Sequence, residues 1–412
     1  MYSYLLVKTF INRNEDYKMK LLYVNNVMED ISPGYKEKIY SQCIAFEELG
    51  FETYLYTSST GGIIIYKIKD GIFNQIYKRN YKYNYYVKSD RIKNRLTLKR
   101  YREFISGMYY AEDLIKPDVT YIRRIYPLLS NFITFIKSVK KLNKIIVYEY
   151  PTFPWEKEMI KGKSYIFYIL DKIYYKRLIS SVDIVTAILG NNIKLPQKFI
   201  EITNGIDVDK NKAKALTLYK DRINLIGVAN LQYWHGFDRI IEGLRDYYTK
   251  NNNIVQVNFH IVGVGHELNN LKNMVNNYGL DKYVIFHGQK AGNELNKLFD
   301  ECQIGIGSLG LYKMNMKVAS TLKAREYCSR GIPFIIGYDE KGFDDNFEYI
   351  LKVSNNDNPI NIEKVIEFYE KTYKNPEVIN NIRHYAKENF NWKKIMNPVA
   401  ENIKTIYKIN NR

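Results

Sequence analysis

Short apolar runs alternate with amphipathic stretches along most of the chain. In the first half, runs rich in Ile, Val, Leu and Tyr predict strands at 21–26, 53–57, 119–123, 144–150, 183–187 and 198–205. Helical spacing of apolar residues predicts helices at 37–50 and 128–142, the first of which ends at Gly50. We expect Pro151 to end the strand that precedes it. Strands separated by helices pair in parallel, since the chain has to cross the sheet between them.

The same alternation restarts after residue 205. It predicts strands at 223–231, 257–265, 283–288, 304–309 and 333–337, and helices at 237–250, 268–279, 294–302, 321–331 and 391–408. The pattern is that of an α/β protein with two doubly wound, Rossmann-like domains, which we expect at 19–200 and 205–385 facing each other across a cleft. Met19 opens a typical first strand, so residues 1–18 are predicted to be an N-terminal extension.

Composition places the chain among soluble globular proteins. Of its 412 residues, 46% are hydrophobic and 26% are charged, and no apolar run is long enough to span a membrane. The first residues lack the basic and small-residue pattern of a secretory signal. The three cysteines, Cys43, Cys302 and Cys328, lie far apart and fit neither a disulfide framework nor zinc spacing. We therefore expect a cytoplasmic protein without a metal site.

The net charge is +18, and much of it lies in a basic insert at 66–110, which holds 12 basic and 3 acidic residues and shows no clear element type. Such a surplus attracts phosphates, whether in nucleic acid, an anionic lipid surface or a phosphorylated substrate. An ordinary basic, solvated surface explains it equally well. Segments 97–110 and 163–177 mix aromatic and basic residues as interfacial helices do, although 163–177 also fits a helix that covers the sheet.

Ligands of open parallel sheets bind beyond the carboxyl ends of the strands, so the loops after strands are the places to search. In the first domain, Gly34 precedes a helix and would let an anion approach its N-terminus, or it belongs to an ordinary Pro-Gly turn. Glu149 stands at a strand end among aromatic residues, where it could bind sugar hydroxyls, act as a base or be a solvated loop acid. In the second domain, Gly263 and Gly265 form only an incomplete dinucleotide fingerprint.

Two further loops of the second domain carry polar residues. Asn230 and His235 follow a predicted strand, and Gly236 precedes the next helix. Ser320 and Thr321 are candidate caps of the helix that contains Lys323, and a helix start with a nearby lysine is suited to phosphate. Glu326 lies on the same helical face, so a surface bridge to Lys323 is the simpler alternative.

Taken in order, these loops resemble the family-four retaining glycosyltransferases, which have the two-domain GT-B fold. The most specific match is STLKAREYCSRGIP at 320–333, which is similar to the family's S-x-L-K-x-x-E-Y-x-x-x-G-x-P helix. The resemblance implies that Glu326 binds the ribose hydroxyls of the donor, and that Lys323, Leu322 and Ser320 lie near its diphosphate. Residues 203–207 match the family's hinge motif, and Gly34 fits its glycine loop. Segment 386–412 resembles the closing helix that crosses back to the first domain.

The chain also departs from the family. Asn230 and His235 stand where an arginine and a lysine usually hold the donor diphosphate, and Val318 stands where a first glutamate is usual. Asp118, Tyr121, Arg123 and the YEYPTFPW segment at 148–155 look like the capsule and exopolysaccharide branch, which places Glu149 and Arg123 on the acceptor side.

The resemblance implies a retaining glycosyltransferase of bacterial surface polysaccharide synthesis. Its donor would be a UDP-sugar or GDP-sugar, and its acceptor a glycan or a polyprenyl-pyrophosphate-linked glycan at the inner face of the membrane, bound peripherally. No cofactor and no obligatory metal are expected, and no residue is assigned as catalytic. The alternative is a transferase-like binding subunit that has lost turnover, which the three departures favour. A nucleic-acid partner is not expected, because no nucleic-acid motif accompanies the charge.

Overall fold

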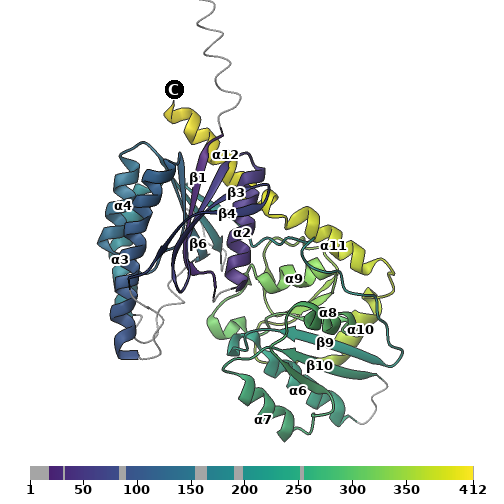
Figure 1. The fold of residues 1–412 in the computed structure, drawn as a ribbon. Helices are drawn as coiled ribbons and strands as arrows, with labels where there is room; N and C mark the ends of the chain where they lie inside the picture. Colours follow the sequence, from purple (N-terminus) through teal and green to yellow (C-terminus); the bar gives the residue numbers. More distant parts are fainter. Residues whose placement is uncertain are drawn as a thin grey trace, which may run out of the picture. The chain divides into compact units, whose positions relative to one another are not determined.

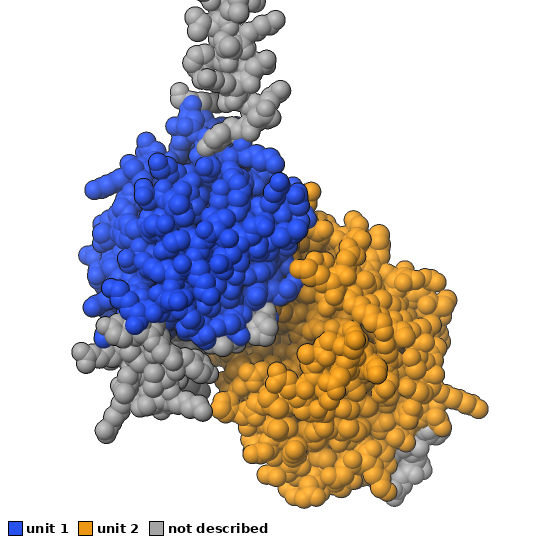
Figure 2. Space-filling model, in the orientation of Figure 1, with its two compact units in different colours: residues 1–187, 195–202, 396–412 blue, residues 188–194, 203–395 orange. Residues whose placement is uncertain are grey.

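The computed structural model describes residues 18–30, 33–82, 90–153, 165–189, 198–250 and 255–411, and the predicted extension at 1–18 lies almost wholly outside them. The chain divides into two compact units, coloured separately in Figure 2. Unit 1 consists of residues 1–187, 195–202 and 396–412, and unit 2 consists of residues 188–194 and 203–395. The last helix, α12 (Trp392–Asn410), thus starts in unit 2 and contributes its later residues to unit 1.

Unit 1 is built on an eight-stranded sheet in the order β4-β3-β2-β1-β5-β6-β7-β8. β1 pairs in parallel with both β2 and β5, and β5 pairs in parallel with β6. The strand order reverses between β1 and β5, which makes their carboxyl ends the expected ligand side. The strands are β1 (Lys20–Met28), β2 (Glu52–Ser58), β3 (Gly62–Lys69), β4 (Ile72–Asn80), β5 (Val119–Arg123), β6 (Ile145–Phe153), β7 (Ile184–Leu189) and β8 (Phe199–Glu201).

The basic insert at 66–110 extends this sheet. It contains most of the antiparallel hairpin β3–β4 and the larger part of a long helix, α3 (Asp90–Ile115). Asp70 and Gly71 form the hairpin turn with φ of 53° and 71°. The carboxylate of Glu47 accepts both of their backbone N–H groups, at 2.6 and 2.9 Å, and so fixes the turn.

Helices cover both faces of the unit 1 sheet. α3 and α4 (Ser130–Lys140) lie on one face and α2 (Pro33–Glu48) lies on the other (Figure 1), and α5 (Tyr165–Ser181) packs against α4. The expectation that Pro151 ends its strand is wrong, because β6 continues to Phe153. The ladder with β5 ends at Glu149, so the missing N–H of Pro151 breaks no bond with that neighbour. Gly34 also lies inside the first turn of α2 rather than before it, since the helix starts at Pro33.

Unit 2 has a six-stranded parallel sheet in the order β11-β10-β9-β12-β14-β16. The order reverses between β9 and β12, as in dinucleotide-binding domains. These strands are β9 (Arg222–Val228), β10 (Gln256–Val262), β11 (Val284–Gly288), β12 (Ile304–Ile306), β14 (Phe334–Ile336) and β16 (Ile350–Lys352). A separate two-stranded sheet joins β13 (Val318–Ala319) to β15 (Asp339–Glu340).

Two hydrophobic clusters hold helices against this sheet. One packs α6 (Phe237–Thr249), α7 (Leu268–Asn277) and α10 (Ile362–Thr372). The other packs α8 (Gly292–Glu301), α9 (Leu322–Arg330) and α11 (Val378–Asn389), and Figure 1 shows α9 beside α11. Gly331 takes the left-handed conformation expected of a glycine that ends a helix, with φ of 77°, and it caps α9.

Candidate functional site

The N-terminus of α9 is open to an anion. Thr321 caps the helix, since its hydroxyl accepts a hydrogen bond from the Ala324 N–H at 3.2 Å. Ser320, the other predicted cap, instead accepts the backbone N–H of Asn204 at 2.9 Å. The N–H groups of Leu322 and Lys323 have no acceptor among the described residues. The first turn of α9 therefore presents two N–H donors and the positive end of the helix dipole.

Lys323 places a buried ammonium group beside this helix end. Its side chain is partly exposed, but Nζ is buried and has no hydrogen-bond partner among the described residues. Nζ lies over the ring of Phe237, 5.1 Å from its centroid, which brings α9 against the start of α6. Burial lowers the pKa of Lys323 to about 7, although the charge of Glu326 opposes the shift. A buried amine without an acceptor requires an explanation, and a bound anion is one partner that would satisfy it.

His235 adds a neutral donor. It ends a short 3-10 helix, η3 (Tyr233–His235), and its Nδ1 accepts the Gln232 N–H at 3.1 Å, so Nε2 carries the ring proton. Burial and the neighbouring charge of Lys323 lower the pKa of His235 to about 2. The Leu309 N–H donates to the His235 carbonyl at 2.8 Å and fixes the loop after β9 against the loop after β12.

Glu326 does not form the surface bridge to Lys323 that the sequence left open. Its Oε1 accepts from Arg330 Nε at 3.0 Å, and Arg330 also donates to Asn296. The Glu326 side chain is 30% exposed, and its Oε2 has no partner among the described residues. The carboxylate is thus held in place by one oxygen while the other stays open to hydroxyl groups of a ligand.

Asn230 is exposed in the loop after β9, next to the incomplete fingerprint Gly263-x-Gly265. A Cβ at Gly263 would lie 1.8 Å from the Ala229 carbonyl oxygen, and one at Gly265 would lie 2.2 Å from that of Leu231. These glycines therefore let the β10 loop support the backbone on both sides of Asn230. Sequence reasoning treated them only as a weak phosphate signal.

The acceptor-side candidates of unit 1 are placed differently from the prediction. Glu149 has no exposed surface and lies within β6 rather than in a solvated loop, and Arg123 is 3% exposed. Glu149 is therefore not a solvated loop acid, because it is buried and β6 continues past it. Arg123 donates to Glu149 Oε1 at 2.9 Å, so these two residues shape the interior of unit 1.

Sequence reasoning missed the other members of this buried network. Lys38 Nζ lies 3.4 Å from Glu149 Oε1, and the hydroxyls of Tyr121 and Tyr23 donate to Oε2 at 2.8 and 3.2 Å. Burial would raise the pKa of Glu149, but the charges of Lys38 and Arg123 outweigh it and hold the pKa below its usual value. Burial lowers the pKa of Lys38 to about 8. The one sequence signal for this network was the position of Lys38 on the apolar face of α2, which indicates a buried lysine that needs a partner.

Two further findings concern the described residues only. They contain no group of three or more His, Cys, Asp or Glu side chains arranged to hold a metal ion. No helix formed by them combines the length and the apolar character that crossing a membrane requires.

Comparison with known proteins adds evidence at the level of sequence. Residues 208–313 match the family model described as glycosyl transferases group 1. An uncharacterized glycosyltransferase of Methanocaldococcus jannaschii is 27% identical over 250 residues, an alignment that covers 56% of this chain and 61% of that protein. The chain thus spans less than two thirds of the length of this curated relative. Both matches are to proteins described as glycosyl transferases.

Solved structures resemble the chain over nearly its full length. Sucrose-phosphate synthase from Thermosynechococcus elongatus has a TM-score of 0.65 at 13% identity and covers 95% of this chain and 100% of its own. The catalytic domain of starch synthase IV from Arabidopsis thaliana, bound to ADP and acarbose, has a TM-score of 0.63 at 10% identity, covering 96% and 99%. The predicted fold class is therefore confirmed: the protein has the GT-B fold, with two Rossmann-like domains.

Proposed function

We propose that the protein is a glycosyltransferase that takes a sugar from a nucleotide-sugar donor bound on unit 2. The ammonium group of Lys323 at the start of α9 carries this proposal, because it is buried and has no hydrogen-bond partner in the described part of the chain. A doubly charged diphosphate would supply the missing partner of Lys323 and the acceptor of the two free N–H groups beside it. The family match at 208–313 includes His235 and its loop but ends before α9, so it supports glycosyl transfer as the reaction and not the role given to Lys323.

Each donor-site residue has a role that its surroundings allow. Glu326 accepts the two ribose hydroxyls, because one carboxylate oxygen is free and the other is fixed by Arg330. Lys323, the Leu322 N–H and the His235 Nε2–H donate to the diphosphate. Ser320 and Asn230 add neutral hydrogen bonds at its edges, where an arginine is absent.

The chemical step needs charge stabilisation above all. When the bond from the anomeric carbon to the phosphate oxygen breaks, negative charge grows on the departing nucleoside diphosphate. In this proposal the diphosphate lies against Lys323 and the N–H groups of α9, so they stabilise the transition state without reorganising. The acceptor hydroxyl oxygen forms the new bond to the anomeric carbon. We include retention at that carbon and independence of an obligatory metal in the proposal.

The acceptor is proposed to be a glycan, free or linked to polyprenyl pyrophosphate, in bacterial surface polysaccharide synthesis. A lipid-linked acceptor would be met at an anionic membrane surface, where the protein would bind peripherally from the cytoplasm. α5 supports this proposal, because Ile169 and Ile173 are 43% and 56% exposed one turn apart, and Lys172, Lys176 and Arg177 are exposed beside them. A helix with exposed apolar residues flanked by cations suits the interface of an anionic membrane.

A second candidate is a binding subunit without turnover. Asn230 carries no charge where the family has an arginine, and Val318 is buried in β13 and offers no carboxylate. In this case the donor site would bind nucleotide, but no sugar would be transferred or released.

The test is to incubate the protein with UDP-sugars and GDP-sugars and to measure release of nucleoside diphosphate, alone and with candidate acceptors. The proposal predicts release from one donor, abolished by Glu326→Ala, and a product whose anomeric configuration by NMR equals that of the donor. Inversion would contradict retention, and binding without any release or transfer would favour the binding subunit.

A further inference from the structure

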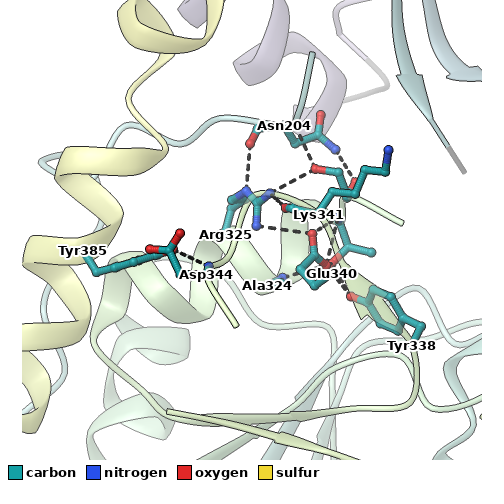
Figure 3. A network of polar contacts seen from close by, with 10 residues as sticks. Asn204, Ala324, Arg325, Tyr338, Glu340, Lys341, Asp344 and Tyr385 are labelled. Atoms are coloured by element: carbon teal, nitrogen blue, oxygen red, sulfur yellow. Dashed lines mark hydrogen bonds and ion pairs between the residues drawn. The ribbon is translucent and has the colours of Figure 1, made fainter. Parts of the chain in front are cut away.

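A buried polar network links the start of α9 to two other segments of unit 2. Figure 3 shows Arg325 between Asn204 and Glu340, with Tyr338 and Lys341 on the neighbouring strand segment. None of these residues belongs to the proposed contacts with the donor. The network nevertheless ends on Thr321, the residue directly before the two N–H groups that face the diphosphate.

Glu340 is the acceptor on which the network converges. Its side chain has no exposed surface, and its carboxylate accepts the Thr321 N–H at 2.9 Å and the Thr321 hydroxyl at 2.8 Å. The Tyr338 hydroxyl donates to the same carboxylate at 2.5 Å. Pairing of β13 with β15 sets Ala319 opposite Glu340 and so brings the carboxylate to the residues that lead into α9.

Arg325 holds Glu340 from the other side. The guanidinium is wholly buried, lies 3.2 Å from Glu340 Oε1, and stacks over the ring of Phe390 at 3.8 Å from its centroid. Its Nε donates to the Asn204 carbonyl at 2.8 Å, and its Nη2 donates to Ser320. Asn204 in turn donates from Nδ2 to the Ser320 carbonyl at 2.6 Å. Residues 320 and 321 are thus fixed through both backbone and side chain.

A buried ion pair is a poor source of stability compared with apolar side chains of similar size. Its role here is better explained by geometry, since the two oxygens of one carboxylate accept the N–H and the hydroxyl of Thr321 at once. Thr321 needs this support because its hydroxyl also caps α9. The direction of the Leu322 and Lys323 N–H groups follows from the placement of the residue before them.

We propose that Glu340, supported by Arg325 and Asn204, is a positioning residue that sets the anion-binding end of α9 through Thr321. This inference rests on the proposed function, because the anion is taken to be the donor diphosphate. Glu340 itself does not touch the donor. It acts on the diphosphate half of the site and leaves the ribose contact of Glu326 unchanged.

The test compares two ligands of the full chain by calorimetry or competition: the nucleoside diphosphate among UDP, GDP and ADP that binds best, and its nucleoside. Glu340→Gln is expected to weaken binding of the nucleoside diphosphate by about tenfold, which is the effect of one charge-assisted hydrogen bond. Binding of the nucleoside is expected to weaken by less than about threefold. Asp300→Asn is the matched control, because Asp300 also accepts a backbone N–H, from Ala215, and pairs with Lys212. The control is expected to leave the ratio of the two dissociation constants unchanged.

A second variant guards against misfolding. In Arg325→Met with Glu340→Leu, apolar side chains replace both charges, so the fold has no unpaired buried ion. The same selective loss of diphosphate affinity is expected. A parallel loss for both ligands, or no loss in either variant, would overturn the positioning role. If the wild-type protein binds no nucleotide at all, the proposed function fails first and the positioning role falls with it.

Discussion

Lys323 makes donor binding dependent on pH. Its pKa is lowered to about 7 in the free protein by burial, and a diphosphate partner restores the protonated form. Below pH 7 the ammonium is already present, whereas above pH 7 binding has to take up a proton. We expect the dissociation constant of a nucleoside diphosphate to rise by up to about tenfold per pH unit between pH 7 and 9.

Titration calorimetry across this range checks the prediction, since proton uptake also appears as a dependence of the heat on the buffer. Lys323→Met should bind the nucleoside diphosphate more weakly, and its dissociation constant should no longer depend on pH between about 7 and 9. His235 should contribute none of it, because its pKa of about 2 keeps it neutral throughout. A wild-type affinity that stays flat from pH 7 to 9 would refute the role given to Lys323.

Glu149 is expected to matter for stability rather than for ligand contact. Glu149→Leu removes the carboxylate that pairs with the buried Lys38 and Arg123, which costs about 3–5 kcal/mol. Glu52→Leu, which removes a partly exposed pair with Lys67, should cost less than about 1 kcal/mol. Urea unfolding of the full chain measures the loss of stability in both variants, and equal losses would disprove the buried network.

The pH dependence of stability has a definite sign at Glu149. Its pKa is held below the unfolded value of 4.5, so its contribution to stability is full above pH 4.5 and is lost as the pH falls through the lower, folded value.

The surroundings of Glu149 could not be predicted from the sequence. Nothing local to YEYP shows that Lys38, more than a hundred residues earlier, lies against it.

At the scale of elements, the loop before α6 interlocks with the loop after β12. Gly236 has φ of 66°, and a Cβ there would lie 2.5 Å from the Gly310 nitrogen. Gly279 has nearly the same φ, 65°, but nothing within 4 Å. Alanine in the left-handed region costs about 1–2 kcal/mol at either position, and the clash adds about 1–3 kcal/mol at Gly236 alone.

Equilibrium unfolding of Gly236→Ala and Gly279→Ala isolates the contribution of this contact, because the two variants share the backbone cost. Gly236→Ala should also weaken nucleotide binding, since the His235 carbonyl is part of the same contact. Equal stabilities of the two variants would show that the loops can move apart without cost.

Elements with local signals were predictable. Gly50 and Gly331 follow helices as expected, because a left-handed residue after the last turn satisfies the free carbonyls. The hairpin β3–β4 was missed although Asp70-Gly71 between two β-type runs is a strong turn signal. Glu340 was missed for a different reason, since its partners Thr321 and Arg325 become visible only once β13 pairs with β15.

For the whole molecule, the charge of +18 predicts association with anionic surfaces. We expect binding to vesicles of phosphatidylglycerol and phosphatidylcholine that weakens with salt, and little binding to phosphatidylcholine alone. Lys172→Glu with Lys176→Glu on α5 should reduce it at least about tenfold, at about 1 kcal/mol per cation. Lys364→Glu with Lys371→Glu on α10 is the control, because it makes the same change in net charge on a helix of unit 2.

Sedimentation with the vesicles measures binding of the wild-type protein to each of the two lipid compositions and binding of the two double variants. If the α10 variant loses as much binding as the α5 variant, the association reflects net charge and α5 has no special part in it.

The two-domain architecture was predictable because strand and helix periods alternate over the whole chain and restart after Gly205. Gly205 also has a packing reason to be glycine, since a Cβ there would lie 2.6 Å from the ring of Trp392. The order of the strands and the hairpin that widens the first sheet were not predictable, because they depend on pairings between distant segments.

The central claim is a nucleotide site at the start of α9. The most direct measurement is binding of UDP, GDP and ADP to the wild-type protein, to Glu326→Ala and to Glu294→Ala. Glu294 is an exposed, ion-paired acid of α8 and serves as the control. We predict that one nucleotide binds, that Glu326→Ala weakens it at least about tenfold through lost hydroxyl hydrogen bonds, and that Glu294→Ala does not. Absence of binding to folded wild-type protein, or equal affinities of all three proteins, would contradict the account.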